Sequence, residues 1–102
     1  MNASLTRWLR PLRRSNLSHL KVTVYTRAQC CCCHKALDLL KDFQRRHGFS
    51  IEEVDVDSDP ELVRLYGEEV PVVTIDGRKS FKLRVDAAAL RAALDRAGAA
   101  GR

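Results

Sequence analysis

The chain has 102 residues, of which 45% are apolar, a globular composition long enough for one modest core and unlike that of a disordered chain. The net charge is +5, but five basic side chains and no acidic one lie within residues 1–21, so the rest of the chain has balanced charge. Balanced charge excludes the basic surface of a dedicated nucleic-acid binder, and no apolar run approaches the roughly 20 residues that span a bilayer. We therefore expect no nucleic-acid or membrane partner.

Residues 1–19 are rich in Arg and Ser, contain no acidic residue, and include Pro11, which interrupts any helix. Targeting presequences and basic arms for acidic partners share this composition. A loosely docked extension is the alternative interpretation. We therefore divide the chain into an N-terminal extension (1–19), one folded domain (20–98) and a C-terminal tail (99–102).

Regular patterns begin at residue 20. The alternating, β-branched sequence of residues 20–25 predicts a strand. Residues 30–47 have helical apolar spacing, and Gly48 is a suitable helix stop. A second strand is predicted over residues 49–56. The expected apolar stripe of the helix comprises Ala36, Leu37, Leu40 and Phe43.

The second predicted helix runs to Tyr66 and has two candidate start signals. Ser58 and Glu61 have the spacing of a capping box. Alternatively, Asp59 caps the helix and Pro60 occupies its first position, where proline is well tolerated.

The last third of the chain predicts a hairpin and a third helix. Residues 72–75 form a short β-branched strand, the Asp-Gly pair at 76–77 favours a type I′ turn, and residues 79–85 supply the partner strand. Asp86 is the expected cap of the last helix, which should end before Gly98. The expected buried face of this helix comprises Leu90, Leu94 and Ala97.

The element order is therefore β-α-β-α-β-β-α. A strand–helix–strand unit implies a parallel pair with a right-handed crossover, and the hairpin adds antiparallel strands. The sequence thus predicts the α/β class, with a central four-stranded mixed sheet flanked by helices on both faces.

All four cysteines are contiguous, from Cys30 to Cys33. A secreted disulfide scaffold spreads its cysteines to close long loops, which adjacent cysteines do not do. The run therefore indicates a reducing, cytoplasmic compartment and thiols that act in catalysis or bind a metal.

The run contains a C-x-x-C that follows a strand and opens a helix, a specific signal for redox chemistry. Unpaired N–H groups and the positive end of the helix dipole favour the thiolate at Cys30. Arg27 and Lys35 add positive charge nearby. Cys33 returns to nearly the same helix face, within disulfide reach. We expect Cys30 to attack a substrate disulfide and Cys33 to resolve the mixed disulfide.

Other roles for these thiols stay open at this stage. A mononuclear zinc site normally needs a second ligand pair, and the chain has no second C-x-x-C. The run, with His34, is also compatible with a metal or iron–sulfur carrier, and a third candidate is a non-enzymatic redox-sensing module. Cys31 and Cys32 point about 100° and 200° away from Cys30 around the helix. They are accessory resolving thiols, soft metal ligands or merely tolerated residues.

The stretch VTVYTRAQCCCC resembles the strand, loop and C-x-x-C of glutaredoxins, and most closely the small bacterial glutaredoxin-like group of the thioredoxin superfamily. The stretch EEVDVDSDPELVRLYGEEVPVVTIDG resembles the second strand, second helix and Val-Pro turn of the same superfamily. The resemblance covers about residues 20–97. It implies a thioredoxin-like fold and a monomeric thiol–disulfide oxidoreductase that needs no organic cofactor. Its substrates would be protein disulfides or glutathione mixed disulfides, with glutathione as a candidate co-substrate.

The resemblance also implies roles for particular residues. Pro71 corresponds to the cis-proline that faces the C-x-x-C, and Val70 would offer main-chain hydrogen bonds to substrate. Arg27 corresponds to the basic residue that approaches the glutathione carboxylate. The chain departs from the family at two places: cysteines fill both middle positions of the motif, and the stretch KSFKLRVD lacks the Gly-Gly pair of glutathione-binding members. We expect no metal site.

Overall fold

The computed structural model describes residues 17–100, so residues 1–16 of the predicted extension lie outside the described residues. The helices and strands follow the predicted order β-α-β-α-β-β-α. Within residues 17–100 no helix has the length and apolar character to cross a membrane. The elements are β1 (Lys21–Thr26), α3 (Cys31–His47), β2 (Ser50–Asp55), the short 3₁₀ helix η1 (Val56–Ser58), α4 (Pro60–Tyr66), β3 (Val72–Ile75), β4 (Arg78–Lys82) and α5 (Ala87–Ala100).

The four strands form one mixed sheet in the order β2-β1-β3-β4. β1 is parallel to β2 and antiparallel to β3, and β3 and β4 form the predicted antiparallel hairpin. Thr26 pairs with Asp55, and Tyr25 pairs with Val72. The loops that follow β1 and β2 therefore lie at the same end of the sheet as the residues that precede β3.

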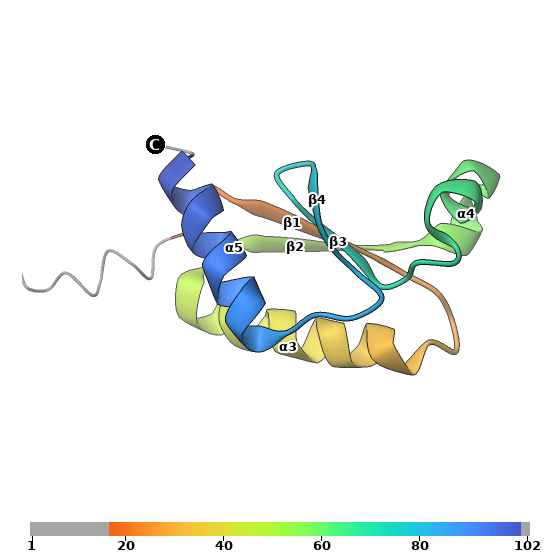
Figure 1. Cartoon of the computed structure of the whole chain (residues 1–102), viewed down its shortest axis with the longest axis horizontal. Coiled ribbons are helices and arrows are strands. Elements are labelled where there is room, and N and C mark those ends of the chain that lie inside the picture. The colour runs from red at the N-terminus through yellow and green to blue at the C-terminus, as the bar shows by residue number, and fades with distance from the viewer. Residues whose placement is uncertain (1–16, 101–102) are drawn as a thin grey trace, which may run out of the picture.

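Helices flank both faces of the sheet. On one face, Val22 and Val24 of β1 join the apolar core together with α3 and α5. Side chains alternate along a strand, so Tyr25 points to the other face, where its ring lies 4.6 Å from the ring of Tyr66 in α4, centroid to centroid. Figure 1 shows α3 and α5 close together and α4 apart from them. The core contains Leu17, Leu20, Val22, Val24, Leu37, Leu40, Phe43, Phe49, Val73, Ile75, Leu90, Ala93 and Leu94.

Local signals determine the ends of α3 and α4. Gly48 takes the left-handed conformation (φ 83°) and its N–H donates to the Gln44 carbonyl at 2.8 Å, which ends α3 where the sequence predicts. At the start of α4, the Asp59 carboxylate accepts the Glu61 N–H at 2.9 Å. The Asp59–Pro60 start is therefore confirmed over the capping box, and Ser58 instead donates its hydroxyl to the Asp55 carbonyl.

The hairpin turn is also as predicted, but the length of its second strand is not. Asp76 and Gly77 both have positive φ (51° and 84°), as a type I′ turn requires. The predicted strand end at residue 85 is wrong, because β4 stops at Lys82. Leu83 adopts φ 72°, a left-handed conformation that leaves the strand geometry.

Asp86 caps α5 as expected, with its carboxylate accepting the Ala89 N–H at 2.9 Å. The predicted end before Gly98 is wrong, since α5 continues to Ala100. A Cβ at Gly98 would lie 2.7 Å from a methyl carbon of Leu17. Gly98 therefore allows the chain before β1 to approach α5 closely and does not stop the helix.

Candidate functional site

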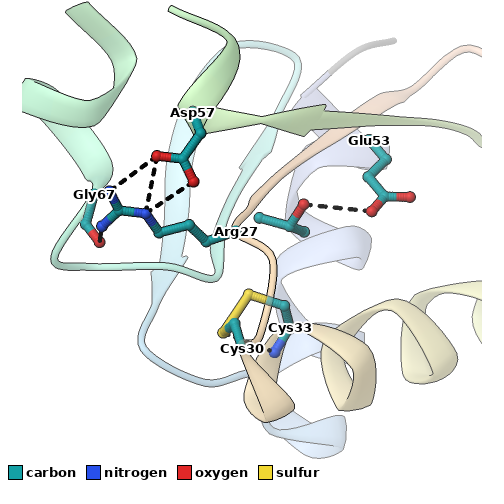
Figure 2. Close-up of a disulfide and its surroundings, with 7 residues drawn as sticks. Arg27, Cys30, Cys33, Glu53, Asp57 and Gly67 are labelled. Carbon is teal, nitrogen blue, oxygen red and sulfur yellow. Dashed lines mark hydrogen bonds and ion pairs between the residues drawn. A yellow bond between two sulfur atoms is a disulfide. The ribbon is translucent and has the colours of Figure 1, made fainter. Parts of the chain in front are cut away.

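The first and last cysteines of the run meet at the start of α3. Cys30 is the N-cap residue, with extended backbone (φ −111°, ψ 103°), and its sulfur accepts the Cys33 N–H at 3.2 Å. The two residues are joined as a disulfide, with their Cα atoms 5.3 Å apart (Figure 2). The three-residue spacing thus brings the two sulfur atoms together, as the sequence predicts.

The two cysteines differ in their access to solvent. Cys33 is buried, with 2% of its surface exposed, whereas Cys30 is partly exposed. Gln29, immediately before Cys30, has φ 66° and so turns the chain from the loop into the helix. A molecule approaching from outside therefore meets Cys30 first.

Arg27 connects the loop before Cys30 to two other segments. Its Nε and Nη2 atoms donate to the Asp57 carboxylate, and its Nη1 donates to the Gly67 carbonyl at 3.1 Å. Hydrogen bonding from Arg27 holds the pKa of Asp57 below its ordinary value of 3.8. Figure 2 shows the Arg27 side chain reaching toward Asp57 and Gly67 and away from the disulfide. All three guanidinium nitrogens thus bond to the protein itself.

Val70 and Pro71 lie at the same end of the sheet as Cys30. β3 begins at Val72, directly after Pro71, and Val72 pairs with Tyr25 near the end of β1, the strand that leads to Cys30. The Val70–Pro71 peptide bond is cis, as the resemblance implies. The Pro71 carbonyl accepts the Leu83 N–H at 3.0 Å. Within residues 17–100 the main-chain N–H and carbonyl of Val70 have no hydrogen-bond partner.

The remaining candidates of the sequence lie around the first turn of α3. Cys31 and Cys32 are free thiols; Cys31 is exposed and Cys32 is half-buried. His34 is exposed. Across the described part of the chain, no three or more His, Cys, Asp or Glu side chains are grouped so as to hold a metal ion.

The sequence alone does not identify Asp57 and Gly67 as the partners of Arg27. Asp57 follows β2 in an acidic stretch where several carboxylates are equally plausible partners. The sequence signal that could have brought Arg27 and Asp57 together is the strand–helix–strand pattern. It predicts that β1 and β2 are parallel, which places the residues after both strands at one end of the sheet.

The chain is similar to proteins of known sequence and structure. Over residues 21–95 it matches the family described as Glutaredoxin-like domain (DUF836). It is 33% identical over 85 residues to the Mycobacterium tuberculosis protein named Uncharacterized protein Rv0508, covering 78% of this chain and 88% of that protein.

Two solved structures extend the comparison. Protein XcR50 from X. campestris is 37% identical, with a TM-score of 0.63 over 74% of this chain and 96% of that one. Glutaredoxin 1 from Francisella tularensis, solved in complex with cacodylate, is 22% identical, with a TM-score of 0.51 over 76% of this chain and 95% of that one, and has the same fold. The fold is thus thioredoxin-like, and the Cys30–Cys33 pair at disulfide distance supports a redox-type function. The chain belongs to the glutaredoxin-like family of the thioredoxin superfamily.

Proposed function

We propose that the protein is a thiol–disulfide oxidoreductase in which Cys30 is the nucleophile and Cys33 the resolving thiol. The observation that carries this proposal is the unequal exposure of two joined cysteine residues: Cys30 is partly exposed, and Cys33 is 2% exposed. The Cys33 N–H donates to the Cys30 sulfur at 3.2 Å, an arrangement that stabilises negative charge on the attacking atom.

The reaction follows from this arrangement. In the reduced protein the Cys30 thiolate attacks one sulfur of a substrate disulfide, so that a Cys30–substrate disulfide forms and the second substrate thiolate leaves. Cys33 then loses its proton to solvent and attacks the Cys30 sulfur. The first substrate thiolate leaves, and the Cys30–Cys33 disulfide forms. Two electrons pass from the dithiol to the substrate disulfide, and a thiol reductant restores the dithiol.

The substrate class is a protein disulfide or a glutathione mixed disulfide. The unpaired main-chain groups of Val70 support this proposal, because an extended peptide beside Cys30 needs such a donor and acceptor. Pro71 follows Val70 immediately before β3 and positions it. Arg27 is the candidate residue to bind a carboxylate of the substrate. That carboxylate would replace Asp57 as the hydrogen-bond acceptor of the guanidinium.

The test is a redox titration of metal-free protein against a glutathione buffer, with the disulfides mapped by mass spectrometry. We expect one reversible disulfide, between Cys30 and Cys33. With a glutathionylated peptide as substrate, Cys33→Ser should accumulate a mixed disulfide that peptide mapping places on Cys30, and Cys30→Ser should lose turnover of the substrate. Cys31→Ser is the matched control, since this exposed thiol has no part in the reaction. A reversible disulfide elsewhere, or thiols that react only after a chelator removes a metal, would contradict the proposal.

A further inference from the structure

A cavity of about 580 Å³ lies between the β3–β4 hairpin and the C-terminal half of α5. Its volume falls within the range of small-molecule pockets. The helix side of the cavity is lined by Ala93, Ala97 and Ala99, together with Arg96. Because an alanine side chain ends at Cβ, these positions leave the space between the helix and the hairpin open.

This cavity and the dithiol lie at opposite ends of the sheet. Val72, the first residue of β3, pairs with Tyr25 near the end of β1, the strand that leads to Cys30. Ile75, the last residue of β3, pairs with Val22 near the start of β1, and it is Ile75 that lines the cavity. The proposed dithiol reaction therefore makes no use of this cavity.

The charged side chains of the cavity leave one positive charge in excess. Arg78 lines it from the hairpin and Arg96 from α5. Among residues 17–100, neither arginine side chain has an ion-pair or hydrogen-bond partner. The third charged residue of the lining is Asp76, whose carboxylate already accepts the main-chain N–H of Lys21 at 2.8 Å. Two guanidinium groups against one carboxylate favour a ligand with a single negative charge.

A carboxylate suits these two arginines better than a phosphate ester does. The planar guanidinium fork binds either group through paired hydrogen bonds. A phosphate monoester, however, carries nearly two negative charges at neutral pH, whereas a carboxylate carries one. One carboxylate therefore balances the excess charge of the cavity.

The wall of the cavity also includes part of the apolar core. Ile75 and Ala93, which are 3% and 8% exposed, belong to the core and line the cavity. A ligand with an apolar chain would cover this wall and gain the free energy of removing apolar surface from water. An inorganic anion, or an organic acid without such a chain, would leave the wall in contact with water.

We infer that this cavity binds a small monocarboxylate that has an apolar chain. The carboxylate accepts hydrogen bonds from Arg78 and Arg96, and the chain lies against Ile75 and Ala93. The ligand is held without a covalent step. This binding site goes beyond the proposed function and does not depend on the Cys30–Cys33 pair.

The experiment is an NMR titration of the ¹⁵N-labelled, oxidised full chain with octanoate. Octanamide, which has the same chain without the charge, and acetate, which has the charge without the chain, are the comparison ligands. The amide shifts should saturate with octanoate and should be largest over residues 75–80 and 93–99. We expect a dissociation constant about three- to tenfold lower for octanoate than for octanamide. Acetate should produce no saturable shifts.

Charge variants test the two arginines. Arg78→Gln with Arg96→Gln should raise the dissociation constant of octanoate to that of octanamide. Lys41→Gln with Arg91→Gln is the matched control, since it removes the same charge from exposed positions of α3 and α5 outside the cavity lining. The control pair should keep the preference for octanoate, and an equal loss in both double variants would overturn the inference.

A second variant tests the apolar wall. Ala97→Leu places a larger side chain in the cavity and should weaken octanoate and octanamide together, by about tenfold or more. Ala88→Leu, exposed in the first turn of α5 and outside the lining, is its control. Circular dichroism confirms that each variant is folded. Shifts that do not saturate, shifts centred on the Cys30 end of the sheet, or equal affinities for octanoate and octanamide would overturn the inference. None of these ligands reacts with a thiol, so no such result bears on the proposed oxidoreductase, whose test is the Cys30–Cys33 titration.

Discussion

Arg27 and Asp57 are 30 residues apart in sequence, yet the guanidinium holds the carboxylate through Nη2–Oδ1 at 2.9 Å and Nε–Oδ2 at 3.1 Å. They meet because β1 and β2 are parallel neighbours, with Thr26 opposite Asp55. The third nitrogen of Arg27 reaches the Gly67 carbonyl at the end of α4. The loop that leads to Cys30 is therefore tied to two other segments by one side chain.

Loss of this connection should slow the dithiol reaction. Asp57→Asn removes the charged acceptor, and Arg27→Lys removes the planar fork that binds it. We expect each variant to reduce a glutathionylated peptide about two- to tenfold more slowly, because the loop before Cys30 is held less firmly. Stopped-flow or coupled rate measurements test this expectation.

Arg64→Lys is the control for those variants. Arg64 makes a similar forked contact with Glu61 on the exposed surface of α4. Its replacement should leave the rate unchanged. A faster reaction of Asp57→Asn would contradict this expectation, because it would show that contact of a released Arg27 with the substrate carboxylate outweighs its hold on the loop.

The Arg27–Asp57 pair also predicts a dependence of stability on pH. Hydrogen bonding from Arg27 lowers the pKa of Asp57 in the folded protein below its ordinary value of 3.8. The stabilisation is therefore fully present above about pH 4 and is lost as the pH falls through the lower, folded pKa. Urea unfolding between pH 2 and pH 6 should show a shallower acid loss for Asp57→Asn than for the wild type. Parallel profiles for the two proteins would exclude this contribution.

Gly67 should not tolerate a side chain. A Cβ at this position would lie 2.6 Å from the Val63 carbonyl oxygen, a backbone atom, and 3.2 Å from Nη1 of Arg27. We expect Gly67→Ala to lower the free energy of unfolding by about 1–3 kcal/mol, as overpacked sites do. Urea denaturation measures the change. Glu68→Ala, at the exposed next position, should change it little, and equal effects at both positions would refute the steric explanation.

At position 83, in contrast to position 67, we expect a change between glycine and a larger residue to favour glycine. Its φ of 72° costs a leucine roughly 1–2 kcal/mol, whereas glycine loses about 0.5–1 kcal/mol in chain entropy. Because the residue is 53% exposed, removal of its side chain gives up less buried surface than the loss of a core leucine does. Leu83→Gly should therefore raise the unfolding free energy by about 0.5–1 kcal/mol. Lys82→Gly, one residue earlier in β4, should lower it, and a destabilised Leu83→Gly protein would contradict the argument.

Features that depend on neighbouring residues can be predicted from the amino-acid sequence. The Asp-Gly turn at 76–77, the stop at Gly48 and the Asp59–Pro60 start of α4 each involve a few adjacent residues with restricted backbone choices. The approach of Cys30 and Cys33 has the same origin, because three residues of helix return the chain to one face. Both wrong boundaries, at the end of β4 and at Gly98, lie where a distant contact outweighs the local signal: Leu83 donates to the Pro71 carbonyl, and Leu17 lies against Gly98.

Which distant residues meet depends on how the strands and helices pack. The bonding of Arg27 to Asp57 and Gly67 depends on the order of the strands. The partner of a basic residue cannot be read from the sequence of a chain that has many carboxylates. The cavity shared by Arg78 and Arg96 likewise exists because the β3–β4 hairpin and α5 pack side by side. Spacing along the chain controls geometry over a turn or a hairpin. Contacts across tens of residues follow from how the sheet and helices pack, which no local pattern encodes.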